Sequence, residues 1–158
     1  MGWNLGRVCG YAELMSKSSN DKSLRQIAAL PWRMRGDVIE VMLITSRETK
    51  RWVIAKGNLM VDLSDPLAAA QEAYEEAGVQ GDIANKPVGQ YPYDKRLKDG
   101  RCVPCVVDVY PLEVLIQLGS WPEVDQRNRQ WMTREEAAVA VAEPELGDLI
   151  RRFSGKID

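Results

Sequence analysis

Hydrophobic and polar positions in the first third of the chain predict strands. Three segments there are rich in β-branched and other apolar residues, which is typical of β-structure. They are RQIAALPWRM (25–34), VIEVMLITSR (38–47) and RWVIA (51–55). RGD at 35–37 predicts a turn between the first two.

A helix is predicted after a loop over residues 56–65. Asp65 is expected to be its N-cap and Pro66 its first helical residue. Gly78 is expected to end it, because glycine adopts the left-handed conformation at helix ends. Apolar side chains recur at helical spacing on two faces, both expected to contact the core. They are Leu67, Ala70 and Tyr74 on one face, and Ala69, Ala73 and Ala77 on the other.

The second half of the chain predicts further strands and a broken C-terminal helix. Strand-like sequence covers residues 79–94, 102–115 and 129–132, with a loop over 119–126. Thr133, with Glu136 three residues later, has the spacing of a capping box, and Pro144 interrupts the helix that follows. The expected fold class is α/β (α+β), a sandwich around a mixed β-sheet. The sequence thus predicts an N-terminal extension, 1–23, and one domain, 24–158.

Composition narrows the class of protein. The chain has 158 residues, 45% of them hydrophobic and 28% charged, which suits one globular domain with a sizeable core. A net charge of -2 gives no electrostatic reason to expect a nucleic-acid partner. No apolar run is long enough for a bilayer, and the N-terminus does not read as a signal peptide. We therefore expect no membrane partner and a cytoplasmic location.

The absence of histidine restricts the possible chemistry. Without histidine the chain lacks the commonest general base and transition-metal ligand, so carboxylates or a hard metal ion would have to act. Cys102 and Cys105 form a C-x-x-C, but the sequence after them is strand-like, whereas a redox pair usually opens a helix. With no second cysteine pair for zinc, both are predicted to be ordinary strand cysteines.

The segment QEAYEEAGV (71–79) places three glutamates on one side of the predicted helix, near its negative end: Glu72, Glu75 and Glu76. Like charges at this spacing cost a few tenths of a kcal/mol per pair, and carboxylates in the last turn oppose the helix dipole. No lysine or arginine lies between Pro66 and Gly78. Either the face is simply solvated, or a divalent cation binds these oxygens, with Mg²⁺ favoured by an all-oxygen site.

The wider segment GNLMVDLSDPLAAAQEAYEEAGV (57–79) favours the second interpretation. It resembles the Nudix box, G-x5-E-x7-R-E-U-x-E-E-x-G-U, where U is aliphatic. The matching positions are Gly57, Glu72, Ala73, Glu75, Glu76, Gly78 and Val79. The resemblance extends over about residues 24–153 and is closest to the diphosphoinositol polyphosphate and diadenosine polyphosphate hydrolase branch.

This resemblance implies hydrolysis of a phosphoanhydride bond in a phosphorylated small molecule. Bound Mg²⁺ or Mn²⁺ would stabilise the charge while water attacks phosphorus. By position, Glu72, Glu75 and Glu76 would be the catalytic metal ligands, together with the carbonyl of Lys56. Which carboxylate would act as the base, and how many metals bind, stays open.

Two positions of the box depart from the pattern: Leu63 replaces the expected glutamate and Gln71 the expected arginine. In the family these two residues support each other and orient the box glutamates. Their joint loss predicts a weakened metal site, although Gln71 can still donate a hydrogen bond to a carboxylate. Two alternatives stay open. One is a catalytically weak domain that binds a nucleotide or a protein, and the other is a MutT-like enzyme that cleanses the nucleotide pool.

A polyphosphate substrate would need cations in addition to the metal. The resemblance suggests the side chains of Arg47, Lys56, Arg101 and Arg127, with Arg25 a weaker match, although each could be an ordinary surface charge. A charged turn over 95–101 could either be a solvated hairpin tip or contact such a ligand. The aromatic residues Trp32, Tyr91 and Tyr93 are predicted to pack in the core or on the sheet.

Overall fold

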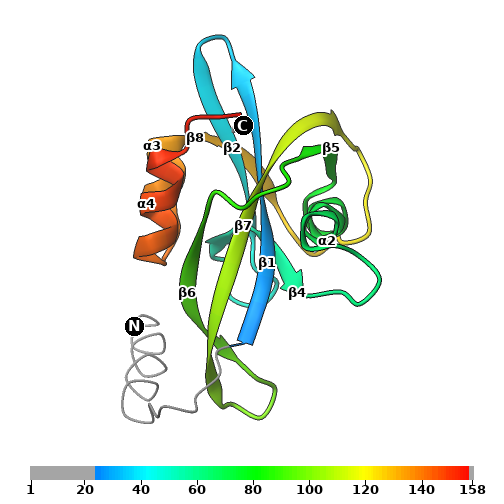
Figure 1. The fold of residues 1–158 in the computed structure, drawn as a ribbon, viewed down its shortest axis with the longest axis vertical. Coiled ribbons are helices and arrows are strands. Elements are labelled where there is room, and N and C mark those ends of the chain that lie inside the picture. Colours follow the sequence, from blue (N-terminus) through cyan, green and yellow to red (C-terminus); the bar gives the residue numbers. More distant parts are fainter. Residues whose placement is uncertain (1–23, 157–158) are drawn as a thin grey trace.

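The computed structural model describes residues 24–156, so the predicted extension over residues 1–23 lies outside the described part. Strands predominate, with one helix in the middle of the chain and two near the end (Figure 1). In chain order the elements are β1 (Leu24–Arg35), β2 (Val38–Thr45), β3 (Trp52–Val53), β4 (Ala55–Asn58), α2 (Asp65–Glu72), the π-helical turn η1 (Ala73–Ala77), β5 (Val79–Ile83), β6 (Gly89–Arg96), β7 (Cys102–Gln117), β8 (Arg129–Thr133), α3 (Arg134–Ala140) and α4 (Pro144–Arg152).

The two longest strands, β1 and β7, form the centre of a mixed eight-stranded sheet. They run parallel, and every other pairing is antiparallel. Each long strand divides its remaining edge between two partners. β1 pairs with β4 through its first half and with β2 through its second, while β7 pairs first with β6 and then with β5. The predicted mixed-sheet sandwich is confirmed.

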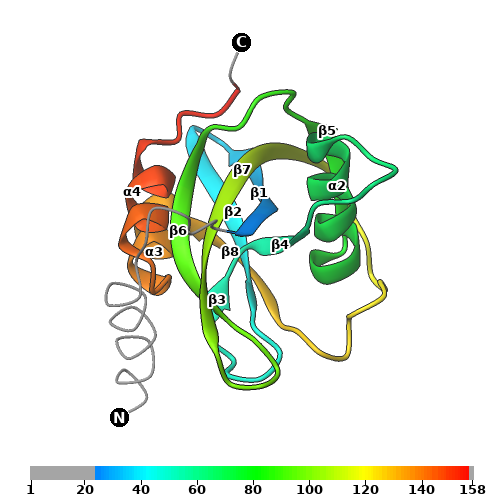
Figure 2. The same ribbon diagram turned by 60° about the horizontal axis from the view of Figure 1, so that its bottom comes forward.

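Helices cover both faces of this sheet, with α2 on one side and α3 and α4 on the other (Figures 1 and 2). Each layer encloses its own apolar cluster. The cluster beneath α3 and α4 contains large side chains such as Leu149 and Phe153. The cluster beneath α2 contains mainly alanines on the helix side, which bring the helix backbone close to the sheet. Trp32 and Tyr91 are buried in the first cluster, as predicted.

The predicted loop over residues 56–65 is wrong at its start. Residues 55–58 form β4, and the predicted third strand is divided between β3 and β4. The segment AKGN has no β-rich composition of its own, and its strand conformation comes from pairing with Gln26–Ala29 of β1. That pairing is between segments far apart in the chain, so local sequence did not indicate it.

The central helix also differs from the prediction. Its N-cap is Ser64, whose hydroxyl accepts a hydrogen bond from the Leu67 N–H at 3.4 Å, and Asp65 is already helical. Leu67 is 52% exposed, so the predicted face of Leu67, Ala70 and Tyr74 is not the core face. The helix instead buries its alanines, including Ala69 and Ala73. Its last turn is a π-helix that ends at Gly78 in the left-handed conformation, with φ of 69°.

The C-terminal predictions are confirmed. Thr133 and Glu136 form a reciprocal capping box at the start of α3. The helix breaks before Pro144, which begins α4 as a separate helix. Both cysteines of the C-x-x-C lie on strand β7, where Cys105 is a buried free thiol. Cys102 is disulfide-bonded, so the prediction of an ordinary strand cysteine is wrong at that position. Among the described residues, no helix has the length and apolar character needed to cross a membrane.

The alanine face of the central helix predicts a difference between two substitutions. Ala69 has no exposed surface, so Ala69→Leu should lower the free energy of unfolding by roughly 1–3 kcal/mol through overpacking. Leu67→Ala, on the exposed face, should change it by less than about 1 kcal/mol. Urea denaturation measures both. A larger loss in Leu67→Ala would mean that the other face is the core face.

Candidate functional site

Glu72, the last residue of α2, faces strand β4 at Gly57. A Cβ placed on Gly57 would overlap the Glu72 carboxylate, so only glycine lets the strand and this side chain come so close. Glu72 is 9% exposed. The first glycine of the box therefore makes room for the first glutamate of its helical part.

Glu76 lies next to Glu72, one turn further along the helix. Its Oε1 accepts the Lys56 N–H at 3.3 Å, which attaches the carboxylate to β4. Burial, and then a hydrogen bond to Glu76 and the charges of nearby glutamates, raise the pKa of Glu72 to about 8. Burial also raises the pKa of Glu76, although Arg127 opposes this. The two carboxylates form a close, partly buried pair that favours holding a proton between them.

Arg127 supplies the positive charge that the helix sequence lacks. Its Nη2 lies 3.7 Å from Glu76 Oε2, its Nε donates to Glu123 Oε1 at 2.7 Å, and its side chain is only 8% exposed. Its Nη1 also donates to the Thr45 carbonyl at 3.2 Å, which fixes the guanidinium in place. The negative charge of Glu123 acts on both Glu72 and Glu76. Sequence reasoning missed Glu123, which no local motif indicated.

The third box glutamate has a different environment. Glu75 Oε2 accepts a hydrogen bond from Gln71 Nε2 at 2.7 Å, so Gln71 does donate to a carboxylate as expected. Leu63, the other departure from the box, packs against the apolar cluster beneath α2. Within residues 24–156, no three histidine, cysteine or acidic side chains come together as a metal-binding group. The structure brings Glu72 and Glu76 together but does not bring Glu75 to the same point.

The donor set nonetheless fits a hard divalent cation. Two adjacent carboxylates in a partly buried position repel each other, and a cation between them would replace the shared proton. Glu72 and Glu76 supply carboxylate oxygens there, and oxygen ligands suit Mg²⁺ and Mn²⁺.

The predicted cationic side chains do not all gather at this pair. The Lys56 ammonium lies 4.8 Å from the centre of the Tyr93 ring, and burial lowers the pKa of Lys56. Arg47 is exposed and contacts Gln126 at 3.4 Å, in the loop that carries Arg127. Arg101 forms an ion pair with Asp99 at 2.8 Å at the tip of the β6–β7 hairpin, where its side chain is 70% exposed. Arg25 pairs with Asp108 and Asp65.

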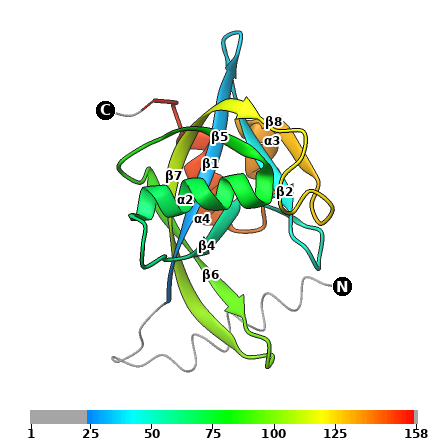
Figure 3. The same cartoon turned by 90° about the vertical axis from the view of Figure 1, so that its right-hand side faces the viewer.

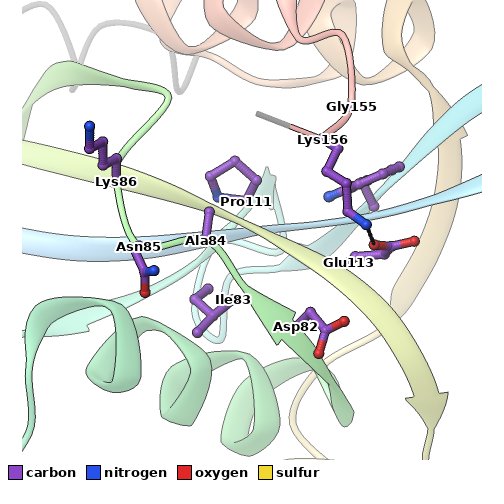
Figure 4. A pocket seen from close by; sticks show the side chains of 10 residues that line it. Asp82, Ile83, Ala84, Asn85, Lys86, Pro111, Glu113, Gly155 and Lys156 are labelled. Carbon is purple, nitrogen blue, oxygen red and sulfur yellow. Dashed lines mark ion pairs between the residues drawn. The ribbon is translucent and has the colours of Figure 1, made fainter. Parts of the chain in front are cut away.

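A cavity of about 300 Å³ lies elsewhere, between β5, the end of β1 and the C-terminal segment (Figure 4). Lys156 forms an ion pair with Glu113 at 3.7 Å on one side of it, and Lys86 lies on the opposite side. Its lining contains none of the predicted site residues. The carboxylate pair, rather than this cavity, is therefore the candidate site.

Comparison with known protein sequences agrees with the pattern of the box. The chain is 31% identical over 140 residues to Nudix hydrolase 17, mitochondrial, of Arabidopsis thaliana, which covers 87% of the chain and 69% of that protein. It is 35% identical over 118 residues to Nudix hydrolase 16, mitochondrial, of the same plant, covering 73% and 65%. The chain spans 60–65% of the length of the first curated relatives that it matches. It matches no protein-family model.

Solved structures share the fold at low sequence identity. A C. elegans Ap4A hydrolase in a binary complex has a TM-score of 0.60 at 20% identity, covering 81% of this chain and 93% of that one. A NUDIX hydrolase from Nitrosomonas europaea has a TM-score of 0.62 at 15% identity, covering 82% and 87%. At these identities the likeness establishes the fold alone.

The raised pKa of Glu72 predicts a pH-dependent gain of stability in Glu72→Gln without added metal. The ordinary glutamate value is 4.5 and the folded value is about 8, so the unfolded chain releases this proton at lower pH than the folded one. Wild-type stability should therefore fall relative to the variant as pH rises from about 4.5 to 8, by roughly 1–3 kcal/mol for a partly buried carboxyl that shares its proton with a neighbouring carboxylate.

Urea denaturation at several pH values measures this difference. Glu48→Gln, on an exposed loop, is the control and should show no such trend. A constant difference between wild type and Glu72→Gln across this range would contradict the shared-proton arrangement.

Proposed function

Because the chain belongs to the Nudix hydrolase family, we propose that it is a Mg²⁺- or Mn²⁺-dependent pyrophosphohydrolase. It cleaves a phosphoanhydride bond in a small phosphorylated substrate: a dinucleoside polyphosphate, a diphosphoinositol polyphosphate or a related nucleoside diphosphate derivative. The observation that carries the proposal is the partly buried Glu72–Glu76 pair against β4. A partly buried pair of like charges is unfavourable without a ligand, and this one lies where the box places its metal ligands.

In this proposal Glu72, Glu76 and the Lys56 carbonyl hold the divalent cation, with Glu75 contributing directly or through water. When bound, the cation supplies charge neutralisation for the phosphate oxygens and a more acidic water. The Lys56 N–H fixes the Glu76 carboxylate. Arg127 lies against Glu76 and Glu123, and its positive charge opposes the rise in the pKa of Glu76 that burial causes. Glu123 is the further acidic group near enough to act on the same pair.

Cations outside the carboxylate pair would bind the rest of the substrate. Arg47, in the turn between β2 and β3, contacts Gln126 next to Arg127, and the β6–β7 hairpin carries Arg101 at its tip. The Lys56 ammonium, on the other side of β4, forms no hydrogen bond or ion pair with any residue in the range 24–156 and would bind a more distant phosphate. Guanidinium groups suit bidentate phosphate contacts. The Ap4A hydrolase with the same fold supports including diadenosine polyphosphates among the candidates.

A second candidate function is supported by the replaced residues of the box. Leu63 is part of the apolar cluster, and Gln71 holds Glu75, so the charged support of the family pattern is replaced by apolar packing and one neutral donor. A domain that binds a phosphorylated ligand without turning it over would keep the carboxylate pair but lose rate. Catalysis and binding are separated by assaying product release and ligand affinity on the same samples.

The first experiment assays product release from diadenosine polyphosphates, diphosphoinositol phosphates, ADP-ribose and nucleoside triphosphates with Mg²⁺ and with Mn²⁺. Glu76→Gln should lower kcat by about a hundredfold or more on the best substrate, because it removes one anionic metal ligand. Glu48→Gln should match the wild type. Preference for oxidised nucleoside triphosphates would favour the MutT-like alternative. Binding without metal-dependent turnover on any substrate would favour the binding module.

Two arginine variants test the division between the inner site and its rim. Arg127→Gln should lower kcat about tenfold or more and shift the acidic limb of the pH–rate profile to higher pH, because Arg127 lowers the pKa of Glu76. Arg101→Gln should mainly raise KM, by about two- to fivefold, and leave the pH profile in place. Steady-state kinetics over a pH series measures both. Identical behaviour of the two variants would contradict this division.

A further inference from the structure

The loop between β7 and β8, together with the first residue of β8, caps the end of the η1 turn at successive backbone carbonyls. The last carbonyls of a helix have no partner within the helix and must find partners elsewhere. Here Glu75 O accepts from the Glu123 N–H at 3.1 Å, and Glu76 O accepts from Trp121 Nε1 at 3.1 Å. Ala77 O accepts from Arg129 Nη1 at 2.9 Å. Figure 3 shows this loop beside the end of the central helix.

Two side chains tie the loop and the turn into one unit. The Arg129 guanidinium lies 3.9 Å from the centre of the Trp121 ring and donates to Gly78 O at 3.2 Å and to Leu118 O at 2.5 Å. A Cβ at Gly78 would overlap both Trp121 and Arg129. Gly78 is therefore needed for this close approach as well as for its left-handed backbone. We call the Trp121–Arg129 pair the clamp.

The clamp and the carboxylate pair share one residue, Glu76. Trp121 holds the backbone carbonyl of Glu76, while Arg127 of the same loop lies against the Glu76 carboxylate. A π-helical turn is rare and less favourable than an α-helical one, so its geometry depends on outside contacts. Removing the indole N–H would free a carbonyl in the turn that carries Glu75 and Glu76.

We propose that Trp121 is a positioning residue: its indole N–H fixes the η1 turn through the Glu76 carbonyl and so sets the Glu76 carboxylate for metal binding and turnover. The inference rests on the proposed function for its kinetic consequence. Trp121 contacts the backbone carbonyl of Glu76 and has no hydrogen bond to the carboxylate of Glu72 or Glu76 in the described part of the chain. It therefore acts on Glu76 through the backbone. Its ring also supports Arg129, which caps the next two carbonyls.

The chain offers a matched control for this test. Trp131 has the same two kinds of contact: Arg33 lies 4.1 Å from the centre of its ring, and its Nε1 donates to Gln117 Oε1 at 2.9 Å. None of these contacts involves the η1 turn. Trp121→Phe and Trp131→Phe each keep an aromatic ring for the arginine and remove one N–H donor. Only the first removes a donor to Glu76.

We expect Trp121→Phe to lower kcat about tenfold, to leave the substrate KM within about twofold, and to weaken Mn²⁺ binding about fivefold. Water-proton relaxation measures Mn²⁺ affinity independently of turnover. Hydrogen exchange over residues 73–78 should also be faster in this variant. Trp131→Phe should match the wild type in kcat, in Mn²⁺ affinity and in exchange over 73–78.

Trp121→Phe behaving like Trp131→Phe in kcat and Mn²⁺ affinity would overturn the inference, even if both variants lose stability. A wild type that binds Mn²⁺ but hydrolyses none of the substrates would remove the proposed function instead. Mn²⁺ affinity and exchange of the Trp121 variant then decide the inference: weaker binding with faster exchange supports it, and unchanged binding overturns it.

Discussion

The concentration of negative charge at the end of the central helix is the constraint on which the rest of the site depends. Glu72 and Glu76 lie against β4 with little solvent, and the helix contributes its own negative dipole there. Within residues 24–156, the nearest positive charge to Glu76 is Arg127, from a loop some fifty residues further along the chain. Folding therefore has to bring distant segments together before the negative charge of Glu76 is compensated by Arg127.

The sheet provides that meeting point. β1 pairs with both β4 and β2, so the strand that contacts the glutamates and the strand that pairs with β8 share one neighbour. β8 follows the loop that carries Arg127, and pairing with β2 holds the end of that loop in place. The alanine face of α2 lets the helix approach the sheet closely. Gly57 then allows Glu72 to lie directly against β4. The fold thus fixes the carboxylates through backbone contacts.

The replaced residues of the box fit this arrangement. A leucine at position 63 adds to the apolar cluster beneath α2, and Gln71 keeps one hydrogen bond to Glu75 without adding a charge. The charge compensation of the site comes instead from Arg127, and the helix end is capped by Arg129 and Trp121. These contacts explain how a chain without the family's internal ion pair can still hold its glutamates in an ordered position.

The sequence by itself determined the strands β1, β2, β7 and β8, the capping box at Thr133, the break at Pro144 and the glutamate-rich helix ending at Gly78, because periodicity, capping and glycine geometry are local properties. It did not show that AKGN is a strand, that Leu67 is exposed, or that the last helical turn is a π-helix. Only the tertiary structure decided those, together with the roles of Trp121, Glu123 and Arg129. Each depends on contacts between segments distant in the chain, where the energy of pairing and burial overrides local preference.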